Sequence, residues 1–98
     1  MSDLTKSQLI DRKPFRFEKD GNTICVTKVD NEVFAIADTC THSEASLSEG
    51  EVSGNKIECW LHGAQFDLKT GEALTLPAVE SVRTYRVVEI DDALTIEI

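Results

Sequence analysis

Short apolar and β-branched runs dominate the chain, and turn signals separate them about every 8–12 residues, a spacing typical of all-β domains. Acidic, asparagine and glycine residues form these turns, at Asp20-Gly21-Asn22, Asp30-Asn31, Lys69-Thr70-Gly71 and Asp91-Asp92. Hairpins are expected across Asp30-Asn31 and Asp91-Asp92. The expected strands are Phe15–Glu18, Thr23–Val29, Val33–Ile36, Lys56–Glu58, Gln65–Leu68, Thr84–Ile90 and Leu94–Ile98. In the last of them Leu94, Ile96 and Ile98 share one face, because side chains alternate along a strand.

Three segments do not fit a strand pattern: residues 38–54, 60–64 and 74–79. No window has a sustained period of 3.6 residues, so long helices are not expected, and one short helical turn fits residues 43–48. The prediction is an all-β antiparallel sandwich or barrel-like base. The irregular segments contain both histidines and Cys40, and Cys59 comes immediately before the second of them. Ligand-type residues on loops between strands are a functional signal.

Length and charge narrow the classes of function. The 98 residues fit one domain. A net charge of −8 argues against binding to nucleic acid or to an anionic membrane, which both require clustered basic side chains. An acidic surface suits docking to a basic protein, although it can also serve solubility alone.

The start of the chain is polar, and no apolar segment approaches the roughly 20 residues of a membrane span. With no signal-peptide pattern, we expect a cytoplasmic protein. Three cysteines are an odd number, and structural disulfides are rare in a reducing compartment. Metal binding or burial is the remaining explanation for them.

Two short motifs combine cysteine with histidine: Cys40-Thr41-His42 and, sixteen residues later, Cys59-Trp60-Leu61-His62. Zinc accepts two cysteines and two histidines, but zinc fingers usually pair like with like. Here each loop supplies one thiolate and one imidazole. This arrangement suits two metal ions, one held by the thiolates and one by the imidazoles, as in a Rieske [2Fe–2S] centre. A structural zinc module and a coincidental set of four residues remain the alternatives.

At these motifs the chain resembles the Rieske ferredoxins of bacterial aromatic-ring-hydroxylating dioxygenase systems. The resemblance covers nearly the whole chain and includes Gly63 after the second motif and the loop around Pro77. It implies a Rieske fold and one [2Fe–2S] cluster. By the same resemblance, the inner iron would be bound by Cys40 and Cys59, and the outer iron by Nδ1 of His42 and His62.

Four positions close to the two motifs distinguish this chain from respiratory Rieske proteins, which have similar ligand motifs. Those proteins have a disulfide between the two loops, at the positions of Ala45 and Leu61 here. They also have a serine and a tyrosine at the positions of Ala64 and Phe66. Hydroxyl donors near sulfur stabilise the reduced cluster, so their absence predicts a low potential, near −150 mV on a scale of about −150 to +300 mV.

The resemblance implies a single Rieske domain over residues 1–98. Its cluster-binding loops would span about 38–54 and 59–66, and its proline loop about 74–80. The protein would be a monomeric one-electron carrier rather than an enzyme. Electrons would pass from a flavin-dependent ferredoxin reductase to a terminal non-haem iron oxygenase. A Rieske-like small subunit of nitrite reductase is the alternative with the same cofactor.

Other residues near the motifs have two interpretations each. Gly63 would let the backbone approach the cluster, or is a turn glycine. Trp60 would shield the cluster or contact a partner, or fill the core. Cys25 is interpreted as a buried small side chain. The acidic residues Glu44, Glu49, Glu51 and Glu58 would form a docking rim or a solvated face.

Overall fold

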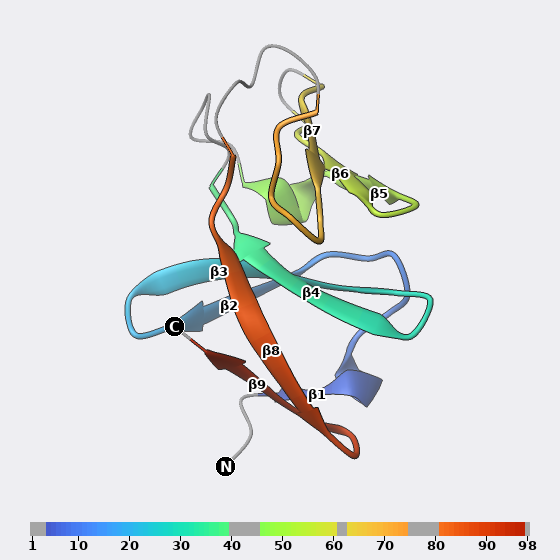
Figure 1. Cartoon of the computed structure of the whole chain (residues 1–98), viewed down its shortest axis with the longest axis vertical. Helices are drawn as coiled ribbons and strands as arrows, with labels where there is room; N and C mark the ends of the chain where they lie inside the picture. Colours follow the sequence, from blue (N-terminus) through green and yellow to red (C-terminus); the bar gives the residue numbers. More distant parts are fainter. Residues whose placement is uncertain (1–3, 40–45, 61–62, 75–80, 98) are drawn as a thin grey trace.

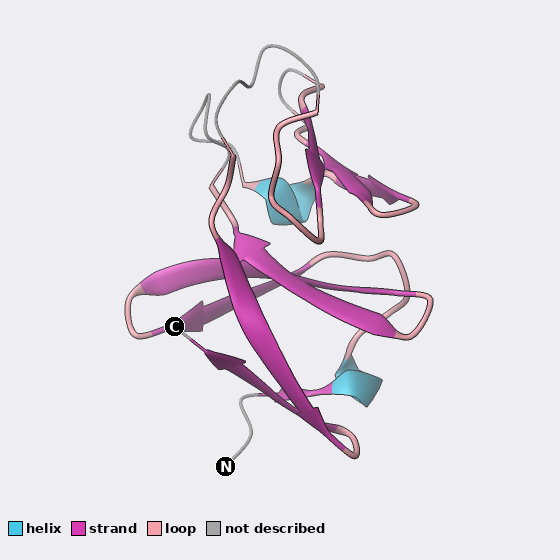
Figure 2. Ribbon diagram, viewed as in Figure 1, coloured by secondary structure: helices cyan, strands magenta, loops and turns pink. Residues whose placement is uncertain are grey.

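The computed structural model describes residues 4–39, 46–60, 63–74 and 81–97. Within these ranges the regular elements are strands and two 3₁₀ turns, so the all-β expectation is confirmed (Figure 2). In chain order they are β1 (Leu4–Thr5), η1 (Lys6–Gln8), β2 (Phe15–Lys19), β3 (Asn22–Val29), β4 (Glu32–Ala37), η2 (Leu47–Glu49), β5 (Glu51–Ser53), β6 (Lys56–Glu58), β7 (Gln65–Asp67), β8 (Thr84–Ile90) and β9 (Ala93–Glu97).

The strands form two antiparallel sheets. A six-stranded sheet in the order β1-β9-β8-β4-β3-β2 makes the base, and a three-stranded sheet in the order β5-β6-β7 makes the lobe. Figure 1 shows the lobe at one end of the long axis, with η2 between it and the base. The base sheet is strongly curled, since Lys19 Nζ on β2 donates to the carbonyl oxygen of Ile96 on β9 at 2.6 Å.

Two-residue turns set the register of the first hairpins. Asp20 and Gly21 have φ values of 50° and 80°, and Asp30 and Asn31 have 48° and 71°. Positive φ at both central positions defines the type I′ turn, whose twist matches that of paired strands. The predicted turns between β2, β3 and β4 are therefore confirmed, as is the hairpin of β8 and β9.

Hydrophobic side chains form two cores. The base core consists of Leu4, Leu9, Ile24, Val26, Ala35, Leu94 and Ile96. The lobe core consists of Cys25, Val29, Phe34, Ile36, Leu47, Ile57, Cys59, Ala64, Phe66, Leu68 and Val82. Successive residues of β3 and β4 contribute to opposite cores, because side chains alternate along a strand. The β3–β4 hairpin is therefore buried on both faces, which explains its nearly continuous apolar sequence.

The structure corrects the expectation that residues 38–54 contain no strand. Strand β5 and the turn η2 both lie in this segment. Strand β5 has only three residues, one of them half-buried, so it gives no readable alternation. Gly54, with φ +58°, turns the chain back into β6. Strand β1 and η1 were also not predicted, and the described part of the expected helical turn is the 3₁₀ turn Leu47–Glu49.

Candidate metal centre

Strand β6 delivers Cys59 to the lobe core. Ile57 and Cys59 are two residues apart and point to the same side, and both are fully buried. The Cys59 N–H donates to the carbonyl oxygen of Ala64 at 2.7 Å, and the Gly63 N–H donates to that of Cys59 at 2.9 Å. These two bonds close a tight loop that begins and ends with buried residues. One predicted ligand thus has a rigid setting.

The stem of the first motif is closed in a similar way. Thr39 and Ser46 face each other as an isolated antiparallel bridge, and the Leu47 N–H donates to the carbonyl oxygen of Asp38 at 2.6 Å. The six residues between Thr39 and Ser46 include Cys40 and His42. Both ends of that segment are therefore held at one place, directly after β4.

Backbone contacts join this stem to β6. Glu51 on β5 pairs with Glu58 on β6, one residue before Cys59. Gly50 approaches so closely that a Cβ atom there would lie 1.8 Å from the carbonyl oxygen of Glu58. The packing of Leu47 with Ile57 and Cys59 in the lobe core completes the connection. The two motif stems are therefore neighbours in the fold.

The stem of the third irregular segment meets the same region. The Leu74 N–H donates to the carbonyl oxygen of Gln65, and the Val82 N–H to that of Gly71, both at 2.8 Å. The Arg83 carbonyl oxygen accepts from Ala37 at 2.7 Å, so the start of β8 lies beside the end of β4. All three predicted loops thus have stems at the lobe end of the base (Figure 1).

Of the predicted ligands, Cys59 lies in the described part of the chain. Cys40, His42 and His62 lie outside the described residues, as do Glu44, Ala45, Leu61 and Pro77. Consistent with this, the described residues contain no group of three or more potential metal ligands. The donor set that the sequence adds to Cys59 is one further thiolate and two imidazoles. Its soft and borderline ligands fit an iron–sulfur cluster placed against the buried thiol.

The structure gives new information on three neighbouring side chains. Trp60 is 54% exposed, so it does not fill the core. Ala64 and Phe66, which carry no hydroxyl group, are fully buried. The predicted turn role of Gly63 is supported by its φ of +74°. Its approach to a cluster stays a prediction.

The acidic residues next to the lobe are arranged across strands. Glu51 and Glu58 face each other on β5 and β6, and like charges directly opposite are destabilising. The Gln65 Nε2 group on β7 donates to Glu58 Oε1 at 3.5 Å. Glu49 and Glu51 are exposed. That these glutamates form a docking rim for a partner remains a prediction.

Asp38 is the site residue that sequence reasoning missed. It is buried at 2% exposure immediately after β4 and two residues before Cys40. Its carboxylate accepts from the Ser46 hydroxyl and, at 2.8 Å, from the Ser48 N–H. The sequence signal for this role was an aspartate at the end of an apolar strand, followed eight and ten residues later by Ser46 and Ser48. That pattern is typical of a capped loop.

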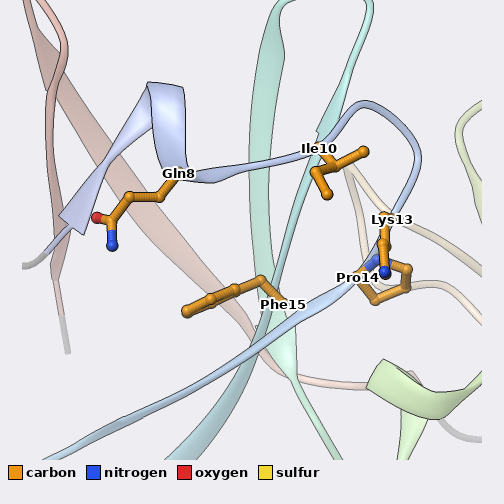
Figure 3. Close-up of a pocket in the computed structure, with 5 residues that line it drawn as sticks. All are labelled: Gln8, Ile10, Lys13, Pro14 and Phe15. Carbon is orange, nitrogen blue, oxygen red and sulfur yellow. The ribbon is translucent and has the colours of Figure 1, made fainter.

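A surface hollow of about 250 Å³ lies elsewhere on the molecule. Figure 3 shows its lining side chains, which come from the segment between η1 and the start of β2: Gln8, Ile10, Lys13, Pro14 and Phe15. None of them belongs to the lobe or to a loop stem. The hollow is therefore separate from the predicted metal site.

The Cys25 thiol is predicted to be unreactive in the native protein. Burial raises its pKa from 9.0 to about 12, and the nearby charge of Asp38 adds to this effect. At pH 9 the buried thiol therefore stays almost fully protonated, whereas an exposed thiol is largely ionised. Treatment with iodoacetamide followed by peptide mapping should therefore show labelling of Cys25 only after unfolding.

The raised pKa of Cys25 also makes the stability of the fold depend on pH. Because the folded state keeps the proton, the contribution of this thiol to the free energy of unfolding is complete below pH 9 and is lost toward pH 12.

Comparison with known proteins extends these observations. The sequence profile of the Rieske [2Fe–2S] domain matches residues 2–86. The ferredoxin component of biphenyl 2,3-dioxygenase from Rhodococcus jostii is 45% identical over 80 residues, which are 81% of this chain and 75% of that protein. The described residues include no helix with the length and apolar character of a membrane span.

Solved structures agree with the sequence matches. The ferredoxin of carbazole 1,9a-dioxygenase from Nocardioides aromaticivorans superposes with a TM-score of 0.95 at 34% identity, covering 99% of this chain and 95% of that one. A ferredoxin solved in complex with the carbazole 1,9a-dioxygenase oxygenase gives a TM-score of 0.92 at 29% identity, covering 98% and 99%.

A Mycobacterium tuberculosis protein described as a nitrite reductase small subunit is 21% identical, with a TM-score of 0.86 over 98% of this chain and 91% of that one. At that identity it shows a shared fold alone. By contrast, the profile covers residues 2–86 of this chain, and the ferredoxin relatives cover most of both chains. The chain therefore belongs to the Rieske [2Fe–2S] domain family, with the predicted antiparallel Rieske fold and a Rieske-type [2Fe–2S] cluster as its cofactor.

Proposed function

We propose that this protein is the ferredoxin of an aromatic-ring-hydroxylating oxygenase system. It carries one electron at a time from a flavin-dependent ferredoxin reductase to a terminal non-haem iron oxygenase. The observation that carries this proposal is the similarity, over most of both chains, to ferredoxin components of dioxygenase systems. The bound cluster supplies a one-electron redox couple. The polypeptide positions that couple, sets its potential and presents it to partners.

The ligands proposed for the cluster are those of the two motifs. Cys40 and Cys59 would hold the inner iron, and His42 and His62 would hold the outer iron through Nδ1. The buried position of Cys59, and the joined stems of both loops, support this assignment. The two imidazoles would then provide the exit for the electron.

The whole chain, residues 1–98, is proposed as one domain with ligand loops at about 38–54 and 59–66 and a proline loop at about 74–80. The β3–β4 hairpin supports this, because it contributes side chains to both cores. We further propose that the carrier is cytoplasmic and monomeric. Partner docking would use the lobe end, where Trp60 follows Cys59 directly and is more than half exposed.

A low reduction potential is the quantitative expectation for this ferredoxin. Phe66 and Ala64 supply no hydroxyl donors, and both are fully buried, so water does not replace the missing hydrogen bonds there. Fewer donors near sulfur leave the reduced, more negative state less stabilised. Redox titration followed by visible absorbance should give a midpoint near about −150 mV. A value above about +100 mV would contradict the proposal and favour a respiratory-type centre.

The electron-transfer function is tested with anaerobically purified protein. A red-brown solution with an EPR signal of average g below 2 after reduction is expected, together with reduction by NADH through a flavoprotein ferredoxin reductase. The reduced protein should then be oxidised by a ring-hydroxylating oxygenase. A colourless protein with stoichiometric zinc would instead establish the structural module. Reduction by a nitrite reductase flavoprotein, but not by ferredoxin reductases, would favour the nitrite reductase subunit.

A further inference from the structure

Asp38 has an unusual position for an acidic residue. Among the described residues it is the one charged side chain that is buried. It lies two residues before Cys40, and two residues of extended chain span at most about 7 Å. Burying a carboxylate is costly unless hydrogen bonds and a counter-charge compensate it. The partners of Asp38 therefore indicate what the fold keeps it for.

Within the described ranges, the carboxylate of Asp38 is in contact with hydrogen-bond donors. The Ser46 hydroxyl donates to Oδ2, and the Ser48 N–H donates to Oδ1 at 2.8 Å. Arg16 Nε on β2 lies 4.0 Å from Oδ2. An ionised carboxylate only accepts hydrogen bonds, so this environment is built for the anion. The side chain thus places a fixed negative charge beside the first ligand loop.

The same contacts hold the loop in place. Ser46 and Ser48 lie at the far end of the segment that begins after Thr39, so the carboxylate links both ends of it. The Asp38 backbone also donates to Thr23 on β3 at 3.1 Å and accepts from Leu47. Asp38 is therefore tied to both the base and the loop stem. Its charge cannot move away from the ligand region, unlike that of an exposed glutamate.

The charge of Asp38 also reaches into the lobe core, because it contributes to the raised pKa of Cys25. A fixed anion that disfavours a thiolate also disfavours an added electron nearby, since both increase negative charge in a poorly solvated region. Arg16 opposes this effect, but its side chain is 60% exposed and is screened by solvent and salt. Among the described residues, Asp38 therefore contributes a buried negative charge before Cys40 that the exposed Arg16 offsets only in part.

We infer that Asp38 is a positioning residue that holds the first ligand loop and lowers the reduction potential of the centre, with Arg16 as a partial counter-charge. This inference rests on the proposed function, because it requires a bound cluster. It assigns part of the low potential to an added negative charge. The missing hydroxyl donors at Ala64 and Phe66 account for the rest.

Two substitutions of opposite sign test this assignment. Asp38→Asn keeps the size of the side chain and removes its charge. At the midpoint potential of the wild type, the ratio of reduced to oxidised protein should rise about tenfold, equivalent to about +59 mV for a one-electron couple. Arg16→Gln should lower the ratio about two- to threefold, a change that salt near 1 M should reduce. The effect of the buried Asp38 should persist in salt.

Glu18→Gln is the matched control, since Glu18 is exposed and its Oε1 lies 3.7 Å from Arg16 Nη2. It should leave the ratio nearly unchanged. Iron content and EPR of each variant separate loss of the cluster from a change in potential. If the Asp38→Asn protein fails to take up iron, the inference is tested by the Arg16→Gln variant alone, through the expected fall in its ratio of reduced to oxidised protein. Unchanged ratios in iron-replete variants would overturn this inference and leave the ferredoxin function intact. A wild type without a cluster would overturn both.

Discussion

A Cys59→Ala variant is expected to lose the [2Fe–2S] cluster completely, whereas Cys25→Ala keeps it. Both cysteines are fully buried members of the lobe core, so the two substitutions remove the same atoms from similar surroundings. Their packing costs should be comparable, about 0.5–3 kcal/mol each. Only Cys59 lies at the loop with the C-x-x-H motif, and the three remaining ligands cannot replace its thiolate. Iron per chain and the visible spectrum after anaerobic purification measure the difference.

The pair of variants distinguishes ligation from packing. Urea unfolding of both apo proteins reports the packing cost without the cofactor. Wild-type iron content in Cys59→Ala would remove Cys59 from the ligand set. Loss of iron in a folded Cys25→Ala protein would bring Cys25 into the site, against its inert setting next to Thr27.

The second large effect is expected for Gly71→Ala, at the turn after β7. Gly71 has φ +78°, and a Cβ atom there would lie 2.2 Å from the carbonyl oxygen of Val82. The left-handed conformation costs an alanine about 1–2 kcal/mol, and displacing packed backbone costs about 1–3 kcal/mol more. We expect the free energy of unfolding to fall by about 2–5 kcal/mol. The Tm of the holoprotein should fall by roughly 10 °C or more.

Gly21→Ala is the matched control, because Gly21 has nearly the same φ of +80° and an added Cβ atom there would meet no other atom within 4 Å. It should therefore show the conformational cost alone, about 1–2 kcal/mol. Differential scanning calorimetry on both variants gives the comparison. Equal losses of stability would mean that the close approach of Gly71 to Val82 contributes nothing.

Much of the fold could be predicted because its strands are bounded by turns with a clear chemical signature. Asp20-Gly21 and Asp30-Asn31 favour positive φ, so the hairpins of β2, β3 and β4 follow from local sequence. The lobe strands carry weaker signals. Strand β5 has three residues and pairs two glutamates across strands, so contacts with β6 and not local propensity determine it. Strand β1 pairs with β9, at the opposite end of the sequence, which no local pattern reveals.

The candidate site was predictable to the extent that its chemistry lies in two short motifs. Cys59 was identified from its spacing to His62, and its burial follows from alternation with Ile57. Asp38 was not identified, because its importance depends on Ser46, Ser48 and Arg16, which lie in other parts of the chain. Long-range contacts of this kind leave no period in the sequence. The exposure of Trp60 likewise depends on tertiary packing.

The hairpin of β3 and β4 has a consequence for how the molecule opens. Its residues belong to both cores, whereas the short strands β5, β6 and β7 belong to the lobe core only. Opening the lobe therefore exposes the lobe core and leaves the base sheet paired. Separating β3 from β4, in contrast, exposes both cores to solvent. Amide protons of the hairpin should exchange with solvent only through global unfolding, and those of the lobe through a smaller, sub-global event. Loss or insertion of the cluster is then expected to require opening of the lobe alone, with the base still folded.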